Sequence, residues 1–151
     1  MRIDELTVRR PVTASPDTTL EQAARKMAVE GVGCLVVTEG DEAVGIVTDR
    51  DLVVRGLAER VPADARLDSV MTTHVVAVDS ATDVRDVVRT LGHHAVRRLP
   101  VVDGRRVVGI VTLDDLMVAL NDQVGELTKG LTAQLLFPHA HDEPPRPVST
   151  R

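Results

Sequence analysis

The chain repeats itself at a fixed spacing, and this repeat limits what it can fold into. The segment Gly45–Leu52, GIVTDRDL, recurs at Gly109–Leu116 as GIVTLDDL, an offset of 64 residues (from 45 to 109). The same offset continues upstream without a gap and pairs Gly40 with Gly104, Leu35 with Leu99, and Val12 with Val76. A single unit of such a repeat usually cannot bury its apolar face without a neighbouring unit. We therefore expect two copies of a unit of about 50 residues, packed about a pseudo-twofold axis.

Each copy has the same predicted order of elements. After a short extended piece, apolar residues at i, i+3, i+4 and i+7 predict a helix, near 20–28 in the first copy and 84–91 in the second. Two strands separated by a glycine-containing turn follow, at 34–38 and 43–48, and again at 99–103 and 107–112. A second helix starts at Thr48 or Thr112. This order predicts an α/β fold of two pseudo-symmetric β-α-β-β-α repeats, packed as one module with a small mixed sheet in each copy.

The predicted boundaries are repeat 1 at 7–60, repeat 2 at 71–122, and a helical extension at 123–137. A tail at 138–151, rich in proline and charge, is expected to be disordered. The first residues lack the apolar stretch of a signal peptide, and no run approaches the roughly 18 apolar residues of a membrane span. We expect a cytoplasmic protein with no membrane partner.

Composition argues against several classes of function. The net charge is -5, with one Phe, no Trp and no Tyr, so neither charge nor base stacking favours nucleic acid. The single cysteine, Cys34, lies in an apolar run and is expected in the core. His93 and His94 are adjacent on a predicted helix and point about 100° apart, which does not suit one metal ion. Asp114 and Asp115 are likewise adjacent and do not converge, so we expect neither a metal site nor an enzyme.

The two GIVTxxDL segments, the segment Arg98–Asp103 (RLPVVD) and the tandem spacing resemble the cystathionine β-synthase (CBS) domain, over roughly residues 7–120. The resemblance implies a usually dimeric module with two clefts between its repeats. Such clefts commonly take AMP, ADP, ATP or S-adenosylmethionine, and the sequence does not choose among these and NAD. It implies a nucleotide sensor that requires no cofactor and regulates a separate, unidentified protein. The alternative is a ligand-free dimerisation or interaction module.

Thr48 and Asp51, like Thr112 and Asp115, stand three residues apart at a strand-to-helix junction. One interpretation is a capping box, in which each side chain accepts from the other residue's backbone N–H. The other is a ligand site, because a carboxylate can accept both ribose hydroxyls and a helix start suits phosphate. The family resemblance implies the second role, with Asp on the ribose and Thr on the phosphate or sugar side.

Arg97 and Arg98 directly precede an apolar strand, and they are either a surface pair bound to nearby acids or phosphate ligands. Their counterparts in the first copy, Gly33 and Cys34, carry no charge, so the two clefts are expected to differ. We assign the arginine pair to the cleft of Thr112 and Asp115 and expect this to be the tighter site. By family geometry, its adenine walls are Pro11, Val12 and Leu35, and those of the Thr48–Asp51 cleft are Val76 and Leu99.

The predicted helices after Thr48 and Thr112 carry apolar faces, and the second continues through Leu127, Leu131 and Leu135. A monomer of this size rarely leaves so much apolar surface exposed. Two-fold dimers are the commonest closed assembly, so we expect a symmetric homodimer formed by these helices.

Overall fold

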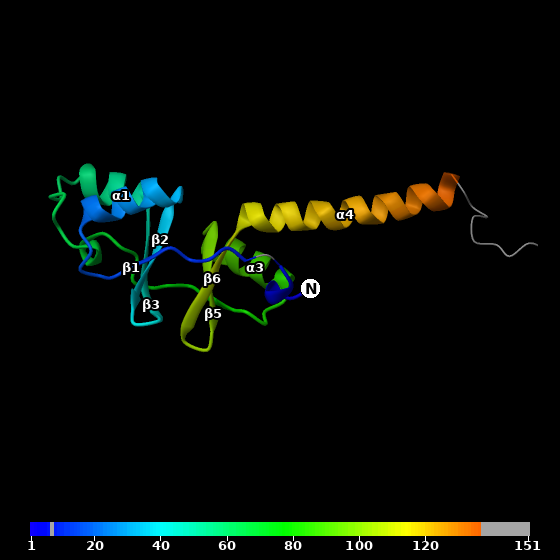
Figure 1. The fold of residues 1–151 in the computed structure, drawn as a ribbon, viewed down its shortest axis with the longest axis horizontal. Helices are drawn as coiled ribbons and strands as arrows, with labels where there is room; N and C mark the ends of the chain where they lie inside the picture. The colour runs from blue at the N-terminus through cyan, green and yellow to red at the C-terminus, as the bar shows by residue number, and fades with distance from the viewer. Residues whose placement is uncertain (7, 137–151) are drawn as a thin grey trace, which may run out of the picture. The chain divides into compact units, whose positions relative to one another are not determined.

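A computed structural model describes residues 1–6 and 8–136, with side chains described to residue 132, and it divides into two compact units (Figure 1). Unit 1 comprises residues 1–113 and holds nearly all of both repeats. Unit 2 begins at Asp114 and, within the described residues, consists of a single long helix. The predicted disordered tail at 138–151 lies outside the described residues.

Both repeats contain the predicted elements in the predicted order. Repeat 1 has β1 (Thr13–Ala14), α1 (Leu20–Glu30), β2 (Cys34–Glu39), β3 (Glu42–Thr48) and α2 (Asp49–Asp51), which continues as a π-helical turn, η2 (Leu52–Leu57). Repeat 2 has β4 (Val78–Asp79), α3 (Val84–His94), β5 (Arg98–Asp103), β6 (Arg106–Thr112) and α4 (Leu113–Leu136). Two 3-10 turns, η1 (Ile3–Glu5) and η3 (Leu67–Ser69), precede the repeats. The start of the predicted extension at 123–137 lies within α4, which runs unbroken from Leu113 to Leu136.

The six strands form one mixed sheet, in the order β1-β2-β3-β6-β5-β4, and the prediction of a separate sheet in each copy is wrong. The two halves join where the hairpin ends meet, through a single register pair, Glu42 with Arg106. The Val107 N–H donates to the Asp41 carbonyl at 2.9 Å, and Arg105 Nη2 lies 2.9 Å from Glu42 Oε1. Complementary backbone groups and opposite charges at these turns therefore connect the two halves of the sheet.

Local signals set the ends of the helices. Thr19 caps α1 by accepting from the Gln22 N–H, and Gly31 ends the helix in the left-handed region at φ 65°. Asp83 caps α3 by accepting from the Arg85 N–H. The residue at the matching left-handed position after α3 is Ala95, at φ 51°, rather than a glycine.

Segments that lead into each repeat pass between β3 and β6. Thr72 pairs with Ile46 on β3, and Arg9 pairs with Ile110 on β6. Glycine is required where these segments pass, because a Cβ at Gly45 would lie 2.5 Å from the Met71 sulfur. A Cβ at Gly109 would collide with Val8 in the same way. The glycine that opens each GIVT segment therefore allows the close approach.

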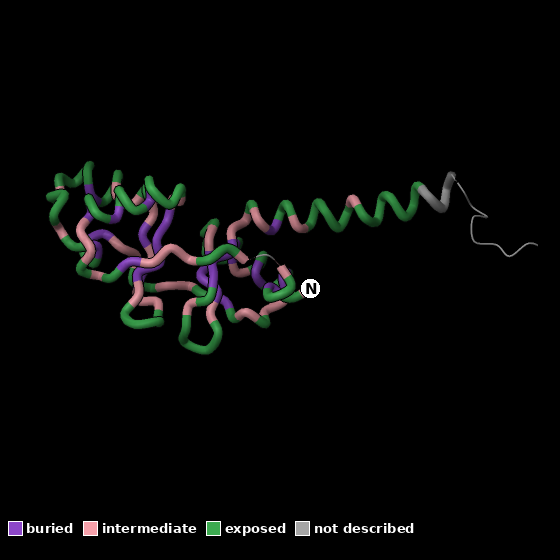
Figure 2. Tube along the Cα trace, viewed as in Figure 1, coloured by how far each residue is buried: buried purple, intermediate pink, exposed green. Residues whose placement is uncertain are grey.

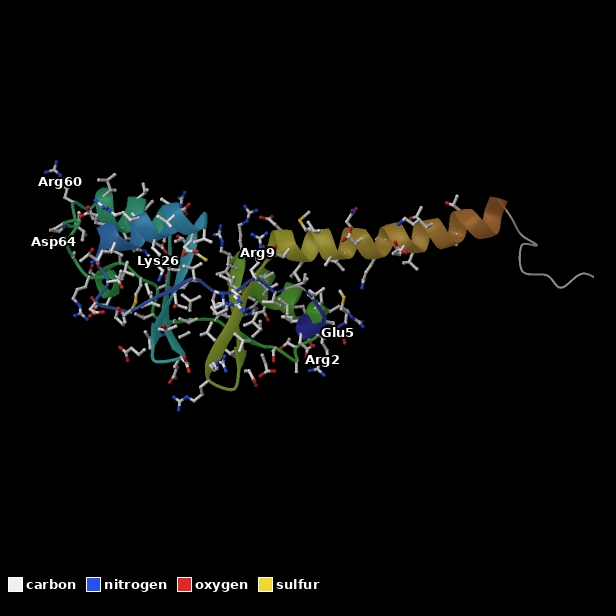
Figure 3. All side chains as sticks on the ribbon, in the orientation of Figure 1. Arg2, Glu5, Arg9, Lys26, Arg60 and Asp64 are labelled. Atoms are coloured by element: carbon white, nitrogen blue, oxygen red, sulfur yellow. The ribbon has the colours of Figure 1, made fainter. Side chains whose placement is uncertain are left out.

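Each leading turn packs on the other repeat. The Ile3 N–H donates to the Thr82 carbonyl at 3.0 Å, so η1 lies against the start of α3. Figure 1 shows the N-terminus beside α3, and Figure 3 shows Arg2 and Glu5 there. The Leu67 N–H donates to the Thr18 carbonyl at 2.8 Å, so η3 lies against the start of α1. Ile3 and Leu67 are both 0% exposed and stand 64 residues apart, so the repeat begins upstream of the predicted residue 7.

Alternate residues of β2 enter two different cores, which explains its continuous apolar run (Figure 2). Leu35 and Val37 pack in the core of repeat 1 with residues that include Leu67. Cys34 and Val36 pack on the opposite side with Ile110 of β6. Cys34 is a buried free thiol, as predicted. Among the described residues, no helix is both long and apolar enough to span a membrane.

Candidate functional site

Unit 1 contains a cavity of about 350 Å³ between residues of the two repeats. Repeat 1 contributes the end of β3 and the start of α2; repeat 2 contributes the segment that enters β4 and the start of β5. The volume falls in the usual range for small-molecule sites. The lining residues are Ile46, Thr48, Asp49, Arg50, Asp51, Thr72, His74, Val76, Ala95, Val96, Arg97, Arg98, Leu99 and Pro100.

Thr48 and Asp51 form the capping box that their spacing predicts. Asp51 N–H donates to Thr48 Oγ1 at 3.1 Å, and Thr48 N–H donates to Asp51 Oδ2 at 2.9 Å. The second carboxylate oxygen, Oδ1, lies 3.8 Å from the Nε of Arg55. Capping thus holds one oxygen of Asp51 and fixes the carboxylate at the cavity, so the capping and ligand interpretations are compatible.

Arg55 also secures the far side of the cavity. Its Nη1 donates to the Val70 carbonyl and to Thr72 Oγ1, both at 3.2 Å. The backbone of Thr72 is held by Ile46 of β3 through two hydrogen bonds, of 2.9 and 3.0 Å. Thr72 therefore lines the cavity from a segment that repeat 1 fixes in place.

Arg97 and Arg98 line this cavity with Thr48 and Asp51. Their assignment to the cleft of Thr112 and Asp115 stays a prediction. Arg98 is the sheet partner of Thr112, yet its side chain reaches toward repeat 1. A Cβ at Gly33 would lie 3.5 Å from Arg98 Nη2 and 3.2 Å from Asp49 Oδ2. A Cβ at Gly33 would be in ordinary van der Waals contact with the guanidinium of the other repeat and in tight contact with the Asp49 carboxylate.

Val76 and Leu99, expected in the cleft of Thr48 and Asp51, do line the same cavity. Leu99 is also 0% exposed, so most of its side chain belongs to the core. The residues assigned to the other cleft lie on several elements: Pro11 and Val12 precede β1, Leu35 is in β2, Thr112 ends β6, and Asp115 is in the first turn of α4. Their grouping into one ligand site stays a prediction.

Basic side chains outnumber acidic ones in the cavity lining. The lining contains the guanidinium groups of Arg50, Arg97 and Arg98 and the carboxylates of Asp49 and Asp51, and the imidazole of His74 adds a further donor. Such a lining suits an anionic group held close to a hydrogen-bond acceptor.

Asp49, Thr72 and His74 were not among the predicted site residues. The repeat offset offered a signal for His74, because it aligns this residue with Arg10 and so places a basic side chain at the same position in both copies. Asp49 and Thr72 gave no comparable signal: the matching residues are Leu113 and Val8.

Cys34 lies near the cavity but is unsuited to react. Burial raises the pKa of the Cys34 thiol, the positive charge of Arg98 opposes this effect, and the negative charge of Asp49 adds to it. A raised thiol pKa leaves less of the nucleophilic thiolate at neutral pH.

We predict that iodoacetamide labels Cys34 at least about tenfold more slowly in the native protein than in urea, because labelling requires local opening. Mass spectrometry over time measures this, and equal rates would contradict it.

Comparison with known proteins places this geometry in a family. The model of the CBS domain matches twice, at residues 3–56 and 67–122. The uncharacterized protein YlbB of Bacillus subtilis is 40% identical over 107 residues, which cover 70% of this chain and 71% of YlbB.

Two solved structures are similar over most of the chain. The CBS domain protein PAE2072 of Pyrobaculum aerophilum, complexed with AMP, is 25% identical with a TM-score of 0.70, covering 76% of this chain and 89% of that one. The CBS domain pair of protein MJ0100, complexed with 5′-methylthioadenosine and S-adenosylmethionine, is 25% identical with a TM-score of 0.73, covering 82% and 98%. The matched repeats, their order and these likenesses together show that the chain belongs to the CBS domain family.

Proposed function

We propose that this chain is a regulatory module that binds an adenosine nucleotide in the cavity at Thr48 and Asp51. The observation that carries the proposal is that a Thr–Asp pair of repeat 1 and an arginine pair of repeat 2 line one cavity. The AMP and S-adenosylmethionine complexes of the two similar proteins support this ligand class. Candidate ligands are AMP, ADP, ATP and S-adenosylmethionine, and the module needs no cofactor and catalyses no reaction.

Each part of a nucleotide has a suitable group in the cavity. The carboxylate of Asp51 accepts the ribose hydroxyls, and Thr48 lies on the phosphate or sugar side. The forked guanidinium groups of Arg97 and Arg98 bind phosphate oxygens. The apolar surface of Val76 and Leu99 contacts the adenine ring. The arginine pair makes this the tighter site, and a cleft with Thr112, Asp115, Pro11, Val12 and Leu35 is the second.

A bound nucleotide would contact both repeats at once, and this is the proposed basis of regulation. The ligand then favours one arrangement of the two repeats, and a separate partner protein recognises that arrangement. The proposal includes a cytoplasmic location and no role for nucleic acid or membrane.

A ligand-free dimerisation module is the second candidate. The observation that favours it is exposed apolar surface on the helical segment after Thr48, where Val53 is 55%, Val54 47% and Leu57 75% exposed. A symmetric homodimer formed by these helices and α4 covers such surface. This assembly is also compatible with nucleotide binding, so binding assays separate the two candidates.

The D51N substitution is expected to weaken AMP binding by about 10- to 100-fold, because hydrogen bonds to a charged acceptor contribute about 1.5–3 kcal/mol. Isothermal calorimetry measures the affinity, after a thermal-shift screen of AMP, ADP, ATP, S-adenosylmethionine and NAD has selected the ligand. The amide of asparagine can still accept from the Thr48 N–H, so the helix start is retained.

Two controls make the result specific. The matched D115N variant is expected to leave the tighter site nearly unchanged. Deoxyribose analogues of AMP, which lack ribose hydroxyls, should bind the wild type weakly. The D51N substitution should lower their affinity little further, because the same hydrogen bonds are already absent. Equal losses in D51N and D115N would contradict the assignment of the tighter site. Absence of binding by every ligand in the screen would favour the ligand-free dimer.

A further inference from the structure

The helix α4 is much longer than its counterpart in repeat 1. The helical segment that starts with α2 ends, as η2, at Leu57, and the 64-residue offset aligns Leu57 with Asn121. α4 continues past this position to Leu136. Its second half therefore has no equivalent in the repeat, and the proposed nucleotide site does not use it.

Apolar side chains follow α4 with alternating spacings of four and three residues. This set, the α4 seam, is 42–69% exposed, and Figure 2 shows exposed residues along most of the helix. A seam with this spacing is the hallmark of helices that pair by knobs-into-holes packing. Its members are Met117, Leu120, Val124, Leu127 and Leu131.

The composition of α4 does not support a free helix in water. Gly125 and Gly130 each weaken it by up to about 1 kcal/mol relative to alanine. Most helices in proteins gain their stability from packing of an apolar face, not from intrinsic propensity. The continuous helix over the α4 seam is thus best explained by a partner on that face.

The residues beside the α4 seam are suited to a second copy of the same helix. The flanking positions, equivalent to e and g of a heptad, hold the uncharged residues Asn121, Gln123, Thr128 and Gly130. The charged residues lie at outer positions, where Lys129 Nζ pairs with Glu126 Oε1 at 2.8 Å. Two identical helices can therefore meet without bringing like charges together.

The identity of the seam residues favours a particular arrangement. With Met117, Val124 and Leu131 at a and with Leu120 and Leu127 at d, β-branched Val occupies the central a position. Among parallel coiled coils, a β-branched residue at a with leucine at d favours two strands. An anionic membrane surface is the poorer partner, because the described part of unit 2 carries four acidic residues and one lysine: Asp114, Asp115, Asp122, Glu126 and Lys129.

We propose that the α4 seam pairs, parallel and in register, with the α4 seam of a second copy of this chain. This coiled coil starts within the last residues of repeat 2 and continues along the chain past the repeat. The inference specifies how α4 contributes to the homodimer named above and rests on that second candidate, and it does not depend on nucleotide binding.

Sedimentation equilibrium of the full chain tests the pairing. The wild type is expected to be a dimer at micromolar concentration, and L127E to raise the dimer dissociation constant at least about tenfold, because it places a charge at a buried d position. The matched control K129E, two residues away on the outer face, is expected to change it by no more than about twofold. A monomeric wild type, or an L127E variant that dimerises like the wild type, would overturn the proposal.

Disulfide trapping tests the register. L127C is expected to form a disulfide-linked dimer under mild oxidation, because parallel d positions face each other across the two-fold axis. The neighbouring E126C serves as the control and is expected to cross-link far less, and the native Cys34 is buried and does not interfere. Equal cross-linking by both variants, or none by L127C, would overturn the parallel arrangement.

Discussion

Replacing Ile3 or Leu67 by alanine is expected to lower the free energy of unfolding by about 2–5 kcal/mol, the usual range for a buried aliphatic residue cut to alanine. Both side chains are 0% exposed, and each is the buried anchor of a turn that packs on the other repeat. The loss is a large fraction of the stability of a small domain. Urea denaturation monitored by circular dichroism measures it.

The variant V29A is the control, because Val29 is 84% exposed and its truncation should cost less than about 0.5 kcal/mol. The same packing predicts that residues 1–62 and 63–151, expressed separately, are unfolded or aggregated. Each half then lacks the surface on which its leading turn packs. A small loss for I3A and L67A, like that of V29A, would contradict the packing described for the leading turns, as would a cooperative, monomeric melt of either half.

The double variant R97A/R98A is expected to weaken AMP binding by about 100-fold or more. This expectation rests on the proposed function, in which both guanidinium groups bind phosphate through charge-assisted hydrogen bonds of about 1.5–3 kcal/mol each. Binding of adenosine, which has no phosphate, should change little, because its ribose and base meet Asp51 and the apolar wall. Calorimetry with both ligands on both proteins measures the difference.

The matched control R105A removes one positive charge from a side chain that is 84% exposed and pairs with Glu42 at the hairpin turn. It should leave the affinity for AMP nearly unchanged at physiological ionic strength, because exposed charges are screened by salt. An equal loss of adenosine and AMP binding in R97A/R98A would indicate damage to the cavity. Unchanged AMP binding would contradict the proposal that the arginine pair binds phosphate.

Most of the secondary structure could be predicted from local patterns. Glycine at 40 and 104 marked the two tight hairpin turns, and both are at positive φ, 60° and 61°. The apolar segments on either side of these turns placed each of the four long strands to within one residue at either end. These features depend on short stretches of chain, which a repeat offset aligns well.

Contacts between the repeats were harder to predict. Arg98 pairs in the sheet with Thr112 of its own repeat, but its Nη2 atom lies beside Gly33 of the other repeat. Gly33 was noted in the sequence only for the charge that it lacks, and its closeness to Arg98 depends on how the two repeats pack. The link between the two halves of the sheet at Glu42 and Arg106 also depends on how whole repeats meet.

Ile3 was missed for a different reason. It is an isolated apolar residue among Arg2, Asp4 and Glu5, and a single residue creates no periodic pattern. Its alignment with Leu67 at the repeat offset was the available signal. That signal gains meaning only when both residues are seen to be buried on opposite repeats.

The exchange of leading turns has the geometry of a domain-swapped dimer. A polypeptide with only one repeat could bury the equivalent of Ile3 or Leu67 on a second chain, and it would then associate in a concentration-dependent way. In the tandem chain, residues 58–66 connect the end of η2 to η3 and make this association intramolecular. Duplication and fusion of the gene for such a swapped homodimer would yield this arrangement directly, with each leading turn already packed on the other repeat.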